Sequence, residues 1–343
     1  MTTDRARDGK VRVGVVGVGI GRLHLEGYRT HPDAEIAAIA DINEERAKAI
    51  AEEFGVPRVY TDYEKMLQQE ELDGVSVCTP NSLHAPVAIA AFEAGCHVLC
   101  EKPIATSAEE GRKMVEAGKK AGKIFMMAFN NRFRGDTQVL KTYIDQGRLG
   151  RIYYAKTGWI RRRGIPGMGG WFTTKAMSGG GPLIDLGVHV LDLTMYLMGN
   201  PKPVAAYGST YAEFGPRMPG GEKYDVEDLA AAIVKFSDGA TVFLEASWAS
   251  NIERDRFYVT LMGTEGGADL EPLRIYTEEN GHQVDIAPHA PAVHGHQAEA
   301  RHFVDCIREN RTPLATGEHG LDVVKILDAI YRSAETGEMV RIA

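Results

Sequence analysis

The stretch VRVGVVGVGIG, residues 11–21, decides the fold class of this chain. Val11–Val16 has the β-branched composition of a buried strand, and a helical pattern follows from Arg22. Glycines between the two let the backbone approach a pyrophosphate at a helix N-terminus, where free amides and the helix dipole favour anions. The residues predicted to bind this group are Gly17, Gly19, Ile20 and Gly21. Because a strict GxGxxG pattern would place glycine where Arg22 stands, we expect a turn one residue shorter than usual.

An acidic residue ends the next predicted strand, Ile36–Asp41. A carboxylate here hydrogen-bonds the adenosine ribose 2′-hydroxyl and repels a 2′-phosphate, and Ile42 and Asn43 supply no arginine to bind that phosphate. The pattern therefore favours NAD over NADP as the cofactor, with Asp41 and Ile42 at the adenosine. The alternative is that Asp41 only caps the helix predicted from Glu44.

The first third of the chain alternates short apolar runs with helical patterns. The predicted strands are Val11–Val16, Ile36–Asp41, Val75–Cys78, His97–Cys100 and Ile124–Ala128. The helices predicted between them include Glu44–Phe54, Tyr63–Gln69 and Pro86–Ala94. This alternation predicts a Rossmann fold, in which helices cover both faces of a parallel sheet.

The sequence pattern changes after Arg132, and strand-like runs dominate from there on. These runs are Ile152–Trp159, Val204–Tyr211, Leu229–Phe236, Ala240–Trp248 and Phe257–Met262. Crossover helices are scarce between them, so we expect a mostly antiparallel sheet. Helical periodicity returns over Glu299–Ala334.

A length of 343 residues favours two domains. We expect an NAD-binding Rossmann domain over residues 1–130 and a second, substrate-binding domain over residues 131–343. The C-terminal helices are candidates to pack back on the first of these domains.

Composition excludes several classes of protein. A net charge of -8 argues against nonspecific nucleic-acid binding, and the run Arg161–Arg163 is more typical of a solvated loop than of an anion or substrate contact. The polar start MTTDRARDGK and the lack of a long apolar run predict neither a secretory signal nor a membrane span, so we expect a cytoplasmic protein. The histidines at 282, 289, 294, 296 and 302 match no compact zinc pattern, and no metal is predicted.

Five motifs carry a family resemblance. They are Gly17–Gly21 with Asp41, Thr79-Pro80-Asn81 with His84, Glu101-Lys102-Pro103, Asn131-Arg132-Phe133, and the run GGGPLIDLGVHVLD over residues 179–192. In this order they resemble the glucose-fructose oxidoreductase / inositol dehydrogenase (Gfo/Idh/MocA) family over nearly the whole chain. The resemblance implies an NAD-dependent oxidoreductase whose Rossmann domain is followed by an α/β domain with a large, mostly antiparallel sheet. It also implies homodimers or homotetramers formed through the open face of that second sheet.

The resemblance also implies positions for the cofactor. Thr79, Pro80, Asn81 and His84 are expected near the dinucleotide, and the turn containing Glu101 and Lys102 beside the nicotinamide. Arg132 is a candidate contact to substrate or to the nicotinamide ribose.

Three residues are expected to form the catalytic centre. Oxidising an alcohol requires a base for the hydroxyl proton and a cation on the same oxygen, and Lys102 follows a strand at the edge where such folds bind ligands. Asp185 and His189 share one face of a helix predicted from Pro182. The resemblance implies that His189 acts as general acid and base, while Asp185 places the substrate or tunes its neighbours. The alternative is a helix-start aspartate with a packed histidine.

The predicted substrate is a sugar, a cyclitol or a related polyol, oxidised at a secondary alcohol. Trp171 is equally well interpreted as a wall that stacks on the substrate ring and as simple packing. Two other functions stay open: an NAD-dependent glycosidase acting through transient oxidation, and a non-catalytic NAD-binding regulator. The joint presence of Lys102, Asp185 and His189 argues against the regulator.

Overall fold

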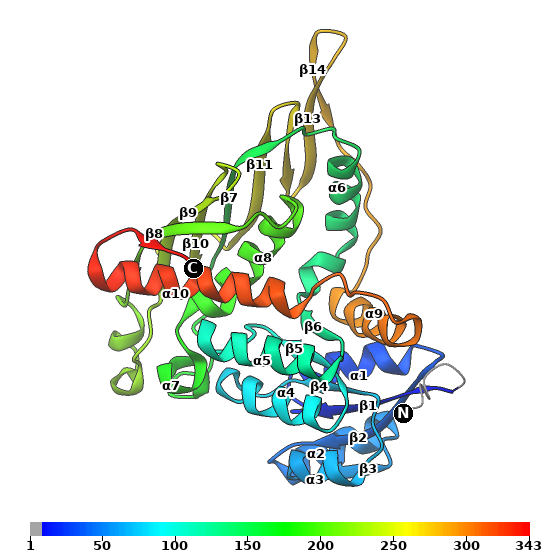
Figure 1. The fold of residues 1–343 in the computed structure, drawn as a ribbon. Helices are drawn as coiled ribbons and strands as arrows, with labels where there is room; N and C mark the ends of the chain where they lie inside the picture. Colours follow the sequence, from blue (N-terminus) through cyan, green and yellow to red (C-terminus); the bar gives the residue numbers. More distant parts are fainter. Residues whose placement is uncertain (1–8) are drawn as a thin grey trace. The chain divides into compact units, whose positions relative to one another are not determined.

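The fold was analysed in a computed structural model that describes residues 9–343 (Figure 1). Residues 1–8, which carry most of the polar start, lie outside the described residues. The chain forms two compact units, which are described separately below. The first comprises the described residues up to Ala105 together with Glu109–Phe133 and His294–Leu321, and the second comprises Thr106–Ala108, Arg134–Val293 and Asp322–Ala343.

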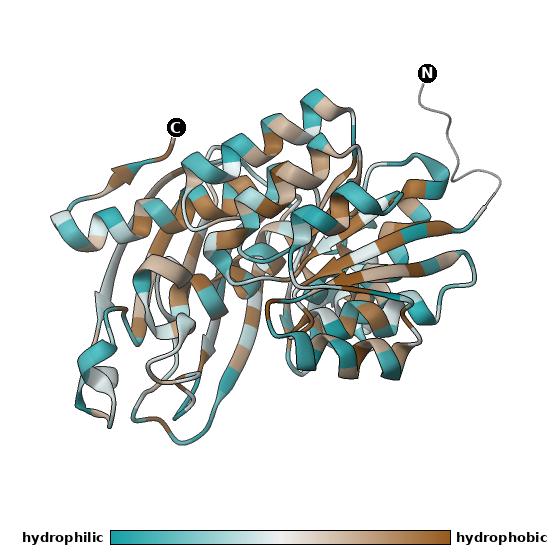
Figure 2. Cartoon of the chain, turned by 90° about the horizontal axis from the view of Figure 1, so that it is seen from below, coloured by the Kyte–Doolittle hydropathy of each residue, from teal (hydrophilic) through white to brown (hydrophobic). Residues whose placement is uncertain are grey.

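The first unit contains a parallel sheet, as predicted, and it has six strands in the order β3-β2-β1-β4-β5-β6. The strands are β1 (Val11–Val16), β2 (Ala34–Ala40), β3 (Arg58–Tyr60), β4 (Gly74–Val77), β5 (His97–Glu101) and β6 (Phe125–Ala128). Brown, apolar residues run along these strands in Figure 2. They are buried because helices cover both faces of a parallel sheet.

Six helices belong to the described part of the first unit, and α2 shows the clearest start and stop signals. They are α1 (Gly21–Arg29), α2 (Glu44–Phe54), α3 (Tyr63–Gln69), α4 (His84–Glu93), α5 (Ala108–Ala121) and α9 (Gly295–Glu309). The side chain of Asn43 caps α2 by accepting the N–H of Arg46, and Gly55 ends the helix with a φ of 69°. Helix α9 packs on α1, where a Cβ at Gly27 would lie 2.7 Å from the Cβ of Ala300.

The second unit contains a nine-stranded sheet with the order β14-β13-β12-β11-β7-β10-β9-β8-β15. The central strands are β7 (Ile152–Ile160), β8 (Pro203–Tyr211), β9 (Leu229–Phe236), β10 (Thr241–Ser247) and β11 (Arg256–Gly263). The outer strands are β12 (Gly266–Leu270), β13 (Leu273–Glu279), β14 (His282–Ile286) and β15 (Val340–Arg341). Neighbouring strands are antiparallel except for β7 and β10, which are parallel. The predicted fold class is therefore confirmed.

Helices pack on one face of this sheet. The helices of the second unit are α6 (Gly135–Asp145), α7 (Lys175–Ser178), the π-helical turn η5 (Leu183–Gly187) and α8 (Val188–Leu197), and α10 (Gly317–Thr336) contributes its residues from Asp322 onward. Helix α8 contacts β7 and β11, while α6 contacts β12 and β13. Side chains on β9 alternate between buried and accessible positions, as expected for a sheet with one covered face. No helix within residues 9–343 is long and apolar enough to cross a membrane.

Candidate active site

The glycines of the first turn have three different surroundings. Gly17 has a φ of 88°, and a Cβ there would lie 2.4 Å from the carbonyl oxygen of Cys78. A Cβ at Gly21 would lie 2.8 Å from Val15 Cγ1, so this glycine lets α1 pack closely on β1. A Cβ at Gly19 would have no atom within 4 Å. These surroundings match the tight turn, the helix–strand contact and the open approach that a pyrophosphate loop requires, with Arg22 already inside the helix.

Asp41 follows β2 and holds the same turn from the inside. Its side chain is only 3% exposed, and its Oδ2 accepts the N–H of Val18 at 2.9 Å. The side chain also accepts from the amide of Asn43 at 2.9 Å and from the guanidinium of Arg46 at 2.8 and 2.9 Å. Burial raises the pKa of Asp41, but hydrogen bonds from Arg46, Val18 and Asn43 outweigh it, so the net shift is downward.

Sequence reasoning missed Arg46, which the first turn of α2 brings back over Asp41. The alternative that Asp41 caps α2 is wrong, because the side chain of Asn43 is the cap. Ile42 lies between them and is 91% exposed.

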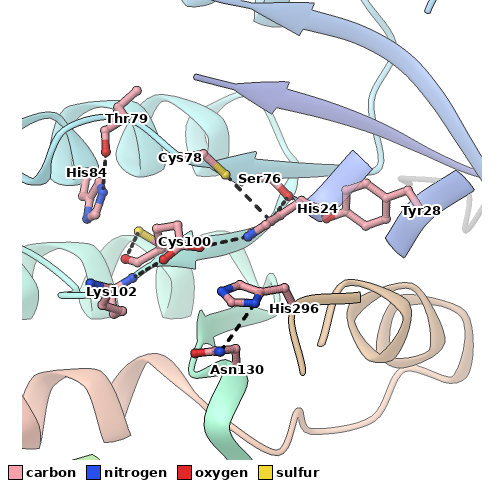
Figure 3. A network of polar contacts seen from close by, with 11 residues as sticks. His24, Tyr28, Ser76, Cys78, Thr79, His84, Cys100, Lys102, Asn130 and His296 are labelled. Atoms are coloured by element: carbon pink, nitrogen blue, oxygen red, sulfur yellow. Dashed lines mark hydrogen bonds and ion pairs between the residues drawn. The ribbon is translucent and has the colours of Figure 1, made fainter. Parts of the chain in front are cut away.

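His84 joins two loops at the ends of β4 and β5. Its ring Nδ1 lies 2.7 Å from the carbonyl oxygen of Pro103. Its Nε2 lies 2.9 Å from the carbonyl oxygen of Thr79, a contact drawn in Figure 3. Burial lowers the pKa of His84 more than the two carbonyls raise it. Among residues 9–343, no group hydrogen-bonds the buried hydroxyl oxygen of Thr79. An orphaned polar atom beside the glycine turn fits a bound cofactor that would partner it. Pro80 and the buried Asn81 form the rest of this loop.

Glu101 ends β5 and lies in a buried polar network (Figure 3). Its Oε2 accepts the main-chain N–H of Lys102 at 3.2 Å, and its Oε1 lies 3.1 Å from His24 Nε2. The other ring nitrogen of His24 lies 3.0 Å from Ser76 Oγ, which lies 2.6 Å from the hydroxyl of Tyr28. Burial raises the pKa of Glu101, but its hydrogen bond to His24 and nearby positive charge give a net lowering.

His24 is a second residue that sequence reasoning missed. It lies on the buried face of α1, three positions after Gly21. Only this helical spacing indicates from the sequence that the side chain of His24 points inward. Together with Glu101 and Glu299 it has ligand atoms within 4.8 Å of one another, but hydrogen bonds already account for His24 and Glu101, and we assign no metal to them.

Arg132 is fully buried within the first unit. Its guanidinium donates to the carbonyl oxygen of Leu314 at 2.7 Å and lies 3.3 Å from His319 Nδ1. Burial and the nearby positive charge of Arg132 lower the pKa of His319 to about 4. The structure thus places Arg132 against the C-terminal segment of this unit, and its contact to substrate or ribose stays a prediction.

Asp185 and His189 belong to the second unit, at the start of one continuous helical segment. Asp185 lies in the π-helical turn η5, and His189 lies in the first turn of α8. The carboxylate of Asp185 accepts the indole N–H of Trp248 at 2.9 Å. The ring of His189 lies 5.7 Å from that of Trp159, tilted by 53°.

Sequence reasoning missed both of these indoles as site residues. The available signal is that Trp159 and Trp248 each end a predicted strand. Because β7 and β10 are parallel, those two strand ends lie at the same edge of the sheet.

Trp171 begins a short 3-10 turn and stacks on Phe172, with ring centroids 3.8 Å apart. Phe172 in turn packs against a core cluster that contains Trp248. Trp171 itself is half-buried, which leaves its substrate-wall role a prediction. The nearby Arg161 lies over the ring of Trp159 at 5.1 Å.

These features together define a class of protein. A parallel sheet with a glycine turn and an acid at the end of β2 is a dinucleotide-binding Rossmann domain, and it is followed here by an α/β domain. Residues 11–129 match a family model described as "Oxidoreductase family, NAD-binding Rossmann fold", and residues 141–342 match "Oxidoreductase family, C-terminal alpha/beta domain". The chain belongs to the Gfo/Idh/MocA family of oxidoreductases, as its motifs predict.

Individual relatives match nearly end to end. D-glucoside 3-dehydrogenase of Escherichia coli (strain K12) is 36% identical over 343 residues, covering 97% of both chains. The scyllo-inositol 2-dehydrogenase (NAD(+)) of Bacillus subtilis (strain 168) is 31% identical and covers 90% of this chain and 89% of its own. A solved structure of levoglucosan dehydrogenase in complex with NADH superimposes with a TM-score of 0.89 at 26% identity, covering 97% of this chain and 99% of its own.

Replacing Asp41 with asparagine should weaken the preference for NAD over NADP. The substitution removes the charge that repels a 2′-phosphate and releases Arg46 from its ion pair. We expect the ratio of the two affinities to fall about 10- to 100-fold, the range for a hydrogen bond to a charged group. Calorimetric titration with each cofactor measures the ratio. The matched variant Arg46→Gln keeps the charge of Asp41 and should keep the preference; an unchanged ratio in Asp41→Asn would contradict the assignment.

The network around Glu101 predicts a pH-dependent stability. Because the pKa of Glu101 is lowered by folding, its ionised form adds stability above its ordinary pKa of 4.5, and this stability is lost as the pH falls through the folded value. The free energy of unfolding of the wild type should therefore exceed that of Glu101→Gln most above pH 4.5, with a shrinking difference below it. Urea denaturation at several pH values measures this difference. Glu109→Gln removes only an exposed ion pair and should change little; a constant gap across pH would refute the prediction.

Proposed function

We propose that this chain is an NAD-dependent dehydrogenase that transfers hydride between the nicotinamide and a secondary alcohol of a sugar, a cyclitol or a related polyol. The observation that carries the proposal is the match to D-glucoside 3-dehydrogenase over 97% of both chains. The Bacillus subtilis relative is named for scyllo-inositol, which widens the class from pyranosides to cyclitols. The presence of Lys102, Asp185 and His189 in one chain supports catalysis of a reaction, as opposed to binding of the cofactor alone.

Each proposed catalytic residue has a defined role. His189 takes the proton of the substrate hydroxyl, as the side chain whose ordinary pKa lies nearest neutrality. Lys102 polarises the same oxygen and shares in proton transfer. Asp185 orients the substrate, and its own carboxylate is held by the indole of Trp248. NAD, when bound, supplies the ring that accepts the hydride.

Residues of the first unit are proposed to hold the cofactor. The pyrophosphate and adenosine side comprises Gly17, Gly19, Ile20, Gly21, Asp41 and Ile42. The nicotinamide side comprises Thr79, Pro80, Asn81, His84, Glu101, Lys102 and Arg132. The exposed side chains of Ile20 and Ile42 give an apolar surface for the adenosine, and the orphaned hydroxyl of Thr79 offers a hydrogen bond. Asp185, His189, Lys102 and Trp171 are proposed to contact the substrate.

Two alternative functions are less well supported. A glycosidase acting through transient oxidation and a non-catalytic NAD-binding regulator would both use the same fold. The named relatives above are dehydrogenases, which favours net oxidation of the substrate.

We also propose that the chain works in the cytoplasm as a homodimer or homotetramer. The uncovered face of the nine-stranded sheet supports the assembly, because Tyr207 on β8 is 43% exposed and pairs with Ile233 on β9, which is 44% exposed. Phe243 on β10 continues the row. An apolar row on an open sheet face is typical of a protein–protein contact.

A substrate panel tests the activity. Inositols, pyranoses and D-glucosides are supplied with NAD, and NADH formation is followed by absorbance. We expect turnover of at least one of them, reduced about 100- to 10,000-fold in Lys102→Ala and in His189→Asn. The control His282→Asn alters an exposed histidine of β14 and should retain turnover. If no polyol is oxidised while calorimetry still detects bound NAD, the proposal is wrong.

A charge on the open sheet face tests the assembly. Ile233→Glu should shift the molar mass, measured by light scattering after gel filtration, from a multiple of the chain mass to that of one chain. The matched variant Met339→Glu places a charge at a 62%-exposed apolar side chain outside the row and should leave the mass unchanged. A wild type that elutes as a single chain would exclude the assembly.

A further inference from the structure

A buried glutamate holds the start of the segment that carries Asp185 and His189. Glu227 precedes β9, and its Oε2 accepts the N–H of Gly181 at 2.8 Å. Its Oε1 accepts the N–H of Leu183 at 3.0 Å. Pro182, between these two residues, has no N–H to offer. One carboxylate therefore takes up both main-chain donors at the entry to η5.

The entry is built for close contact with this carboxylate. A Cβ at Gly181 would lie 2.0 Å from the main-chain oxygen of Glu227. A Cβ at Gly180 would lie 2.0 Å from the hydroxyl of Tyr331, and that hydroxyl donates to Glu227 Oε1 at 2.9 Å. Gly181 is thus required by Glu227, and Gly180 by the tyrosine that orients its carboxylate.

A short path of hydrogen bonds leads from this carboxylate to Asp185. The peptide N–H of Gly181 donates to Glu227, and the carbonyl oxygen of Gly181 accepts the N–H of Asp185 at 3.1 Å. The first N–H groups of a helix have no acceptor within it, and an anion at this end is favourable. A π-helical turn lacks the regular hydrogen bonding of an α-helix, and such turns occur often at functional sites. The direction of η5 therefore depends on an acceptor from outside the helix.

We propose that Glu227 is a positioning residue of the dehydrogenase, which sets Asp185 and, one turn further on, His189. This inference rests on the proposed function. Glu227 acts through the main chain of Gly181 and Leu183, and Tyr331 fixes which way its carboxylate faces. Stability alone explains its presence poorly, because a buried carboxylate is expensive to desolvate and an apolar side chain would fill the same space.

Two tyrosines give a matched test. Tyr331→Phe removes the hydroxyl that orients the Glu227 carboxylate, whereas Tyr224→Phe removes one that donates to the main-chain oxygen of the same residue at 2.9 Å. We expect kcat for the best substrate to fall about 10-fold in Tyr331→Phe and about 100-fold in Glu227→Gln, the scale of a small misplacement of a reacting group. KM and the affinity for NAD should change less than threefold. Tyr224→Phe should stay within twofold of the wild type in kcat.

Hydrogen exchange separates this inference from the proposed function. Peptides covering residues 181–190 should exchange faster in Tyr331→Phe than in Tyr224→Phe, while the urea midpoints of the two variants agree. That result supports the positioning role even if no polyol is oxidised, in which case only the activity has failed. Equal exchange and equal kcat in the two variants would overturn the role of Glu227. So would a loss of kcat in Tyr331→Phe that follows a general loss of stability.

Discussion

A carboxylate stays inside a protein only where hydrogen-bond donors meet it, and three buried carboxylates fix the loops of the proposed site. They are Asp41, Glu101 and Glu227. Each accepts main-chain N–H groups: Asp41 those of Val18 and Asn43, Glu101 that of Lys102, and Glu227 those of Gly181 and Leu183. Glycine-rich and proline-containing loops have few internal hydrogen bonds, so an external acceptor decides their path. The backbone of these loops then sets the positions of the reactive side chains.

Much of the fold could be predicted from local pattern. The strand Val11–Val16 and the helices Glu44–Phe54 and Tyr63–Gln69 lie where their periodicity and caps place them. Two of the missed strands lack those signals: β3 spans three residues with no buried side chain, and β14 is largely exposed. The inclusion of His294–Leu321 in the first unit could not be read locally, because the packing of α9 on α1 joins residues far apart in the chain.

The residues of the candidate site also fall into those that local sequence pattern predicts and those that it does not. Residues with a motif spacing, such as Lys102 and His189, were selected from the sequence, whereas their supports were not. His24 reaches Glu101 across 77 positions, and Trp248 reaches Asp185 across 63. Sequence separation of that size carries no periodic signal, so only the folded chain reveals these contacts. Arg46 was missed at a separation of five, because the turn capped by Asn43 redirects the chain between it and Asp41.

One strand pairing in the second unit links its architecture to its chemistry. In a sheet whose other described neighbours are antiparallel, β7 and β10 run parallel, with Trp159 opposite Ala246. Their ends therefore deliver Trp159 and Trp248 to the same edge, where η5 packs on both strands. An antiparallel pairing would carry the two indoles to opposite edges. The contacts of Trp248 with Asp185 and of Trp159 with His189 thus follow from strand direction, and the helical segment needs only its entry fixed by Glu227 to meet them.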